Sequence, residues 1–164
     1  MPARLIIILQ SIIMKLAEAL VLRSDMKKKM ESLRERIAKN AIVQEGEEPS
    51  EDPGTLMKEA NGAIKQYREL VVKINATNVN QALPDGRSIM EAIAQRDELV
   101  QKHSLLTHAA AHSVRENDRY SQSEIKWRAC LDVKKMRKQI DDLSKKIREV
   151  NLLIQETNWK TDLE

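Results

Sequence analysis

Apolar side chains recur every three or four residues along four stretches of this chain, and clusters of glycine and proline separate most of them. This spacing is typical of helices that bury one face. It predicts helices over about 14–43, 54–78, 88–114 and 133–158. The fourth stretch is the most regular, with apolar residues at Val133, Met136, Ile140, Leu143, Ile147, Val150 and Ile154.

Two connections contain six of the eight glycines and prolines, at residues 44–54 and 83–87. Asp52 followed by Pro53 is typical of a helix start, because the carboxylate accepts free amide hydrogens and proline has none to lose. Ser88 and Glu91 have the spacing of a capping box. Four helices of similar length predict a mainly α fold, either an antiparallel bundle or a pair of coiled-coil hairpins, as one domain over 14–164.

The third connection has a different pattern. Apolar and polar residues alternate there, the apolar ones being Ile125, Trp127, Ala129 and Leu131. Period two predicts a half-buried strand, and we expect a small β element near 123–132. A lone strand leaves backbone groups unpaired, so it requires a partner. That partner is either an extended piece near 79–83 or the same strand of a second subunit, which would make it an assembly strand.

The amino-acid composition favours slender helices rather than a fold with a broad globular core. The 164 residues include no phenylalanine and only four aromatic side chains, and 32% are charged. Aromatic residues dominate broad globular cores, so the interior here must consist of aliphatic residues and methionine. These totals disfavour a β-sandwich or an ordinary α/β enzyme.

Charge is distributed unevenly, although the net charge is only +3. Residues 44–59 contain six acidic residues and one basic residue, whereas 126–148 contain nine basic and three acidic residues. The basic stretch could bind nucleic acid or a membrane surface. We favour a solvated helix face that attracts the acidic segment, within or between subunits, because no aromatic residues for base stacking accompany it. Nucleic acid is therefore a disfavoured partner.

The first residues resemble a targeting signal only superficially. An apolar run at 5–14 follows Arg4, but Gln10 and Ser11 interrupt it and it is too short to span a bilayer. We expect residues 1–13 to be an extension in front of the domain. Secretion, and membrane contact through 5–14, are minority alternatives. The lone Cys130 excludes an internal disulfide and agrees with a reducing cytoplasm.

Three residues could form a metal site. His108, His112 and Glu116 are spaced four apart on one predicted helix face. The row lacks the glutamate of HExxH metalloproteases and the Glu-x-x-His pairs of di-iron bundles. We favour polar or interfacial histidines and keep a divalent metal as the one candidate cofactor. No catalytic constellation is evident, so we expect no enzymatic activity.

Several short motifs together resemble the septicolysin-like family of small bacterial proteins, over about residues 14–164. They are Met14–Leu20, Gln44–Pro49, Asn75–Asn78, Asp85–Arg87, Arg96 and Asp97 with Leu99, Asp118–Lys126 and Asn158–Leu163. The resemblance places residues 1–13 outside the family pattern. It implies no established activity, cofactor or substrate, and we treat the pore formation suggested by the name as inherited labelling.

A polar cluster accompanies these motifs, formed by Arg87, Arg96, Asp97, Arg119, Tyr120, Ser121 and Glu124. These residues could surround a ligand pocket. We favour a structural role, because a polar cluster at a chain reversal can satisfy exposed backbone groups.

The leading functional hypothesis is a cytoplasmic helical protein that self-associates as a homo-oligomer and serves as a structural or interaction module. Its basis is the exposed heptad seams, the partnerless strand and the two poles of opposite charge. The alternatives are a membrane-active, cytolysin-like protein and a helical bundle that binds a metal or another ligand.

Overall fold

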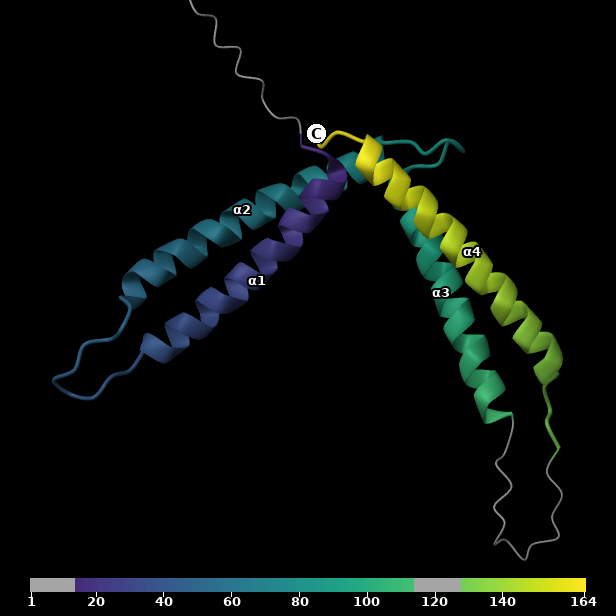
Figure 1. The fold of residues 1–164 in the computed structure, drawn as a ribbon, viewed down its shortest axis with the longest axis horizontal. Helices are drawn as coiled ribbons and strands as arrows, with labels where there is room; N and C mark the ends of the chain where they lie inside the picture. The colour runs from purple at the N-terminus through teal and green to yellow at the C-terminus, as the bar shows by residue number, and fades with distance from the viewer. Residues whose placement is uncertain (1–13, 114–127) are drawn as a thin grey trace, which may run out of the picture. The chain divides into compact units, whose positions relative to one another are not determined.

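The computed structural model describes residues 14–113 and 128–164. Within them the chain forms four α-helices: α1 (Leu16–Asn40), α2 (Pro53–Asn80), α3 (Ile89–His112) and α4 (Val133–Lys160). These two ranges contain no strand, only two isolated antiparallel bridges. The prediction of a mainly α fold with four long helices is confirmed (Figure 1). The expected extension at 1–13 lies outside the described residues.

The helices belong to two compact units. One unit consists of Met1–Gln81 and Thr157–Glu164, and the other of Ala82–Glu156. The first contains the hairpin of α1 and α2 together with the last residues of α4, and the second contains α3 and the rest of α4. Each unit contains buried apolar residues, such as Leu33 and Leu56 in the first and Ile89 and Ala92 in the second.

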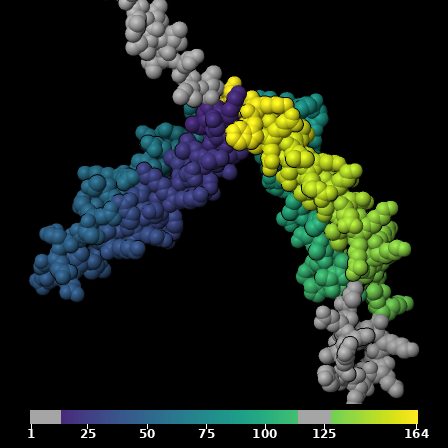
Figure 2. All heavy atoms as spheres, in the orientation of Figure 1, coloured from purple at the N-terminus to yellow at the C-terminus, as the bar shows by residue number. Residues whose placement is uncertain are grey.

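An apolar seam joins α1 to α2. At its centre Leu33 packs with Leu56 and Ala63, and each of these side chains is at most 5% exposed. Three partly buried side chains surround them: Met30, Ile37 and Ala60. The atoms of the two helices form a continuous surface along the hairpin (Figure 2). Leu56 and Ala63 are seven residues apart, and this spacing keeps them on the face of α2 that packs against α1.

The N-terminus of α2 begins as predicted. The Asp52 carboxylate accepts the backbone N–H of Thr55 at 2.7 Å and its hydroxyl at 2.6 Å. Pro53 occupies the first turn. The expected N-cap is confirmed, and these bonds to its charged form lower the pKa of Asp52.

The C-terminal residues close the first unit. Two backbone hydrogen bonds, of 2.9 and 2.8 Å, join Leu16 and Met14 to residues 161–163. The backbone N–H of Glu164 donates to the hydroxyl of Thr77 at 3.1 Å, and Thr77 is itself only 1% exposed. The chain end thus satisfies polar groups at the start of α1 and the end of α2.

A tight turn precedes α3 in the second unit. Gly86 has a φ of +88°, which favours glycine, and its N–H donates to the carbonyl of Leu83 at 2.9 Å. Leu83 in turn donates to the carbonyl of Arg87 at 2.7 Å. The Ser88 hydroxyl then accepts the N–H of Glu91 at 3.2 Å, while the Glu91 carboxylate accepts the N–H of Ser88 at 2.7 Å. The predicted turn and capping box are confirmed.

The prediction of a small β element near 123–132 is wrong for the part of that range that the structure describes. Residues 128–132 form no strand, and Ala129 and Leu131 are exposed. Instead, the Asp132 carboxylate accepts the N–H of Lys135 at 2.9 Å at the beginning of α4. Residues 129–131 thus belong to the segment that directly precedes α4, and this segment needs no partner strand. Ile125 and Trp127 of the proposed assembly strand lie outside the described residues.

We predict that Ile74→Ala lowers the free energy of unfolding by about 2–5 kcal/mol, because Ile74 is completely buried and its truncation leaves a cavity. The matched control is Val72→Ala, two residues away on α2 and 61% exposed, with an expected change within about 0.5 kcal/mol. Urea unfolding followed by circular dichroism measures both. Equal losses would contradict the packing of Ile74 in the interior.

Candidate functional site

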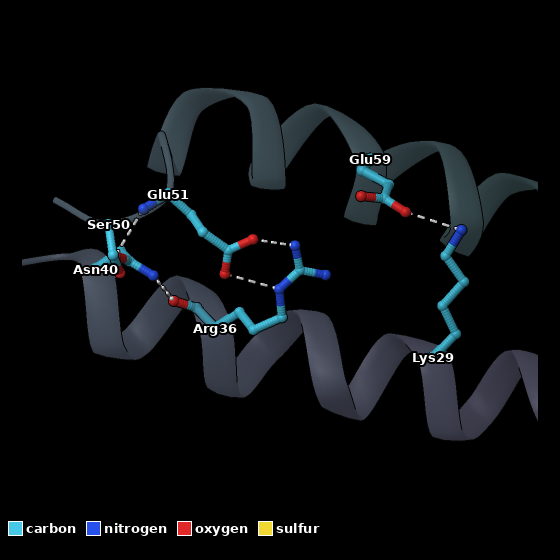
Figure 3. A network of polar contacts seen from close by, with 6 residues as sticks. All are labelled: Lys29, Arg36, Asn40, Ser50, Glu51 and Glu59. Carbon is cyan, nitrogen blue, oxygen red and sulfur yellow. Dashed lines mark hydrogen bonds and ion pairs between the residues drawn. The ribbon is translucent and has the colours of Figure 1, made fainter.

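A polar network holds the connection between α1 and α2 at its base. The side-chain oxygen of Asn40, Oδ1, accepts hydrogen bonds from the hydroxyl of Ser50 at 2.9 Å and from the backbone N–H of Glu51 at 3.1 Å. Its amide nitrogen donates to the carbonyl of Arg36 at 2.9 Å (Figure 3). Asn40 is only 7% exposed. The last turn of α1 is therefore tied directly to the residues that precede α2.

An ion pair reinforces this network. The Arg36 guanidinium forms two parallel bonds to the Glu51 carboxylate, one of them from Nε at 2.9 Å (Figure 3). The hydrogen bond from Arg36 lowers the pKa of Glu51, and the same bond raises the pKa of Arg36. One and a half turns into α2, Lys29 lies 2.8 Å from Glu59 and lowers the pKa of that carboxyl. One ion pair thus holds the connection against α1, and the other joins α1 to α2.

The outer part of the same connection carries negative charge. We call Glu45, Glu47 and Glu48 the acidic tip. All three are exposed, and none has an ion-pair partner in the described ranges 14–113 and 128–164. Gly46 has a φ of +89° between them, and Glu47 donates to the carbonyl of Gln44 at 3.0 Å, so the tip is a turn. Its three carboxylates have no ion-pair partner within the described residues, and the connection that carries them is held in place by Asn40.

A surface of the opposite sign runs along α4 in the second unit. The basic face consists of five exposed residues at helical spacing: Lys134, Arg137, Lys138, Lys145 and Arg148. Among the residues described, only Lys145 has an acidic partner, Glu149 at 3.9 Å. Asp141 lies on the same side of the helix by its spacing and reduces the net positive charge. The face still has an excess of cations.

A shallow groove lies between α3 and α4. Its volume is about 400 Å³, and it is lined by Lys102, Leu105, Leu106, Gln139, Asp142, Leu143 and Lys146. Leu105 is 69% exposed, so the apolar floor is accessible to solvent. The lining contains one carboxylate and two ammonium groups but no histidine, cysteine, serine or threonine. It therefore lacks the hydroxyl, thiol and imidazole groups that form the common pairs of nucleophile and base.

The predicted metal row is described only in part. His108 and His112 lie one turn apart near the end of α3, and both are exposed. Glu116 falls outside the described residues. In the described part of the chain, no three side chains from His, Cys, Asp and Glu are grouped to hold a metal ion. The three-residue site stays a prediction.

The predicted polar cluster is also only partly described. The Arg87 guanidinium binds Asp85 and Gln95, and this contact lowers the pKa of Asp85. Arg96 instead pairs with its neighbour Asp97, at 2.7 Å. The other members, Arg119, Tyr120, Ser121 and Glu124, lie outside the described residues. A ligand pocket formed by these residues is untested.

Asn40, the centre of the α1–α2 network, was not predicted from the sequence. A helix-terminal asparagine before a long acidic connection could have indicated a side chain that bonds to the backbone. Arg36 and Glu51 were missed because their separation of fifteen residues crosses the connection, and no helical spacing relates them.

Comparison with known proteins places the chain in a family. Residues 23–163 match the model of a family of unknown function (DUF6847), so the chain belongs to that family. It is also similar to the crystal structure of a functionally unknown conserved protein from Corynebacterium diphtheriae. That similarity has 34% identity and a TM-score of 0.86, and it covers 92% of this chain and 99% of that chain. Comparison with curated proteins gave no match.

These findings correct the resemblance to the septicolysin-like family, which is wrong. The matching family model has no such description, and neither has the similar structure. The short motifs behind the resemblance have local structural roles here: Asp85–Arg87 is part of a turn, and Asn158–Leu163 ends α4 and closes the first unit. Such segments recur in unrelated helical proteins because they satisfy helix ends. No helix in the described residues is long and apolar enough to cross a membrane.

We predict that Glu51→Gln destabilises the first unit at neutral pH. Because the folded pKa of Glu51 is lowered from 4.5, the stabilisation is complete above about pH 4.5 and is lost as the pH falls through the folded pKa. Wild type and variant should therefore differ at pH 7 and converge in acid. Urea unfolding at several pH values measures the difference. Glu35→Gln, at an exposed position of α1, is the control, and an equal pH response there would contradict the prediction.

Proposed function

We propose that this member of the DUF6847 family is a non-catalytic cytoplasmic module that self-associates, the acidic tip of one copy binding the basic face of α4 on another. One observation carries the proposal. The chain has two exposed surfaces of opposite sign whose charges are almost all uncompensated within the described residues. Both surfaces belong to well-formed elements, the connection anchored by Asn40 and the helix α4.

Complementary charge favours this pairing physically. A single exposed ion pair contributes about 0–1 kcal/mol, so one contact is too weak to hold two copies. Three carboxylates meeting several ammonium and guanidinium groups act together, steer the encounter and set the register. Asp141 within the basic face sets which cations can engage the tip, because it repels a carboxylate placed directly over it.

The two surfaces differ, and each copy carries both. Two copies can therefore exchange tip and face reciprocally around a twofold axis, or copies can bind head to tail in a closed ring or an open filament. In each arrangement the acidic tip contacts α4, which distinguishes the proposal from assembly through a shared strand.

Other features support a non-catalytic role in a reducing compartment. The ion pairs that align the first unit and stabilise α3 join carboxylates to lysine or arginine at the protein surface, an arrangement typical of structural contacts. The single cysteine, Cys130, is exposed at the lead-in to α4. An exposed free thiol persists unmodified most readily in the cytoplasm.

The test uses the full chain and two charge-reversed variants. The tip variant carries Glu45→Lys, Glu47→Lys and Glu48→Lys, and the face variant carries Lys134→Glu, Arg137→Glu and Lys138→Glu. Light scattering at about 0.1 M and 1 M salt, where the Debye length is roughly 10 Å and 3 Å, should show wild-type assemblies only at the lower salt. Each variant alone should be monomeric, because its two surfaces now have the same sign.

Mixing the two variants should restore assembly, since each surface then meets its opposite on the other chain. The matched control carries Lys27→Glu, Lys65→Glu and Lys73→Glu, the same change in net charge at exposed positions of α1 and α2, and should assemble like the wild type. A monomeric wild type at micromolar concentration and low salt would contradict the proposal. So would a mixture that stays monomeric.

A further inference from the structure

Two imidazoles share one face of α3 at its C-terminal end. His108 and His112 are separated by one helical turn, and both side chains are exposed to solvent. Their ring centroids lie 4.1 Å apart, with an angle of 34° between the ring planes. The two rings therefore lie close together and are tilted with respect to each other.

A hydrogen bond determines which nitrogen of His112 carries the proton. Its Nδ1 lies 2.9 Å from the backbone carbonyl oxygen of His108. A carbonyl oxygen can only accept, so Nδ1 is the donor and is protonated. In the neutral ring, Nε2 then has a free lone pair. Histidines that bind metals commonly donate their other nitrogen to a carbonyl in this way, which fixes the ring orientation.

We propose that His108 and His112 together bind one divalent cation of borderline softness, such as Zn²⁺, Cu²⁺ or Ni²⁺, through their imidazole nitrogens. Imidazole suits these ions, whereas Mg²⁺ and Ca²⁺ prefer oxygen ligands. The proposal is independent of self-association, because both ligands come from one helix of one copy.

The number of protein ligands defines the type of site. A structural zinc site takes four protein ligands. Over the described residues, no third His, Cys, Asp or Glu joins this pair. Within the described residues the pair therefore supplies two protein ligands, fewer than a structural zinc site requires.

Bound metal has a local structural effect. His112 is the last residue of α3, and terminal turns of helices fray. A cation that bridges His108 and His112 closes this last turn. Because the ion binds the helical arrangement in preference to the frayed one, it stabilises the helix end by linkage.

The test titrates the full-length protein with Zn²⁺ by calorimetry and with Cu²⁺ by electron paramagnetic resonance. We expect one ion per chain and a copper spectrum with two nitrogen ligands. His108→Gln and His112→Gln should each weaken binding roughly tenfold or more, because each removes the chelate, and the double variant should lose most of what remains. Circular dichroism confirms that the variants retain their helices.

Two control variants test the assignment. His103→Gln, on the same helix, and Cys130→Ser remove the other histidine and the thiol, and both should bind like the wild type. Binding that survives in the double variant, or that disappears with His103→Gln or Cys130→Ser, would overturn the proposal. Absence of binding to the wild-type chain would overturn it as well.

Discussion

A helix that packs against a single neighbour can bury only one stripe of its surface, and this limit shapes the first unit. The seam of α1 and α2 has only three buried side chains at its centre, Leu33, Leu56 and Ala63. Because so little is buried, most of each helix is exposed. Alignment of the hairpin then depends on the few polar contacts that cross it, such as Arg36 with Glu51 and Lys29 with Glu59.

The same limit explains where specificity can reside. A narrow apolar seam buries few side chains, and the groove between α3 and α4 is open to solvent. Distinctive chemistry lies on the exposed surface instead, in the acidic tip, the basic face and the pair of histidines. Asn40 matters because it anchors the base of the acidic tip and so gives that part of the surface a defined position.

Membership of the DUF6847 family and similarity to the Corynebacterium diphtheriae protein extend the fold to relatives but assign them no role. The septicolysin-like resemblance, in contrast, rested on short motifs alone and was wrong. Short polar motifs that cap helices or form turns are reused wherever helices end, so several can agree in order without common function.

The sequence alone determined the features that depend on neighbouring residues: four helices, the Asp52 cap, the capping box of Ser88 and Glu91, and the turn at Gly86. Each follows from spacing or backbone preference within a few positions. Tertiary structure decided the pairing of Arg36 with Glu51, the contact of Thr77 with Glu164 and the division into two units. All three depend on contacts between residues that no helical spacing relates, so local periodicity does not predict them. The alternation at 129–131 predicted a strand wrongly for the same reason, because a strand exists only where a partner backbone is available.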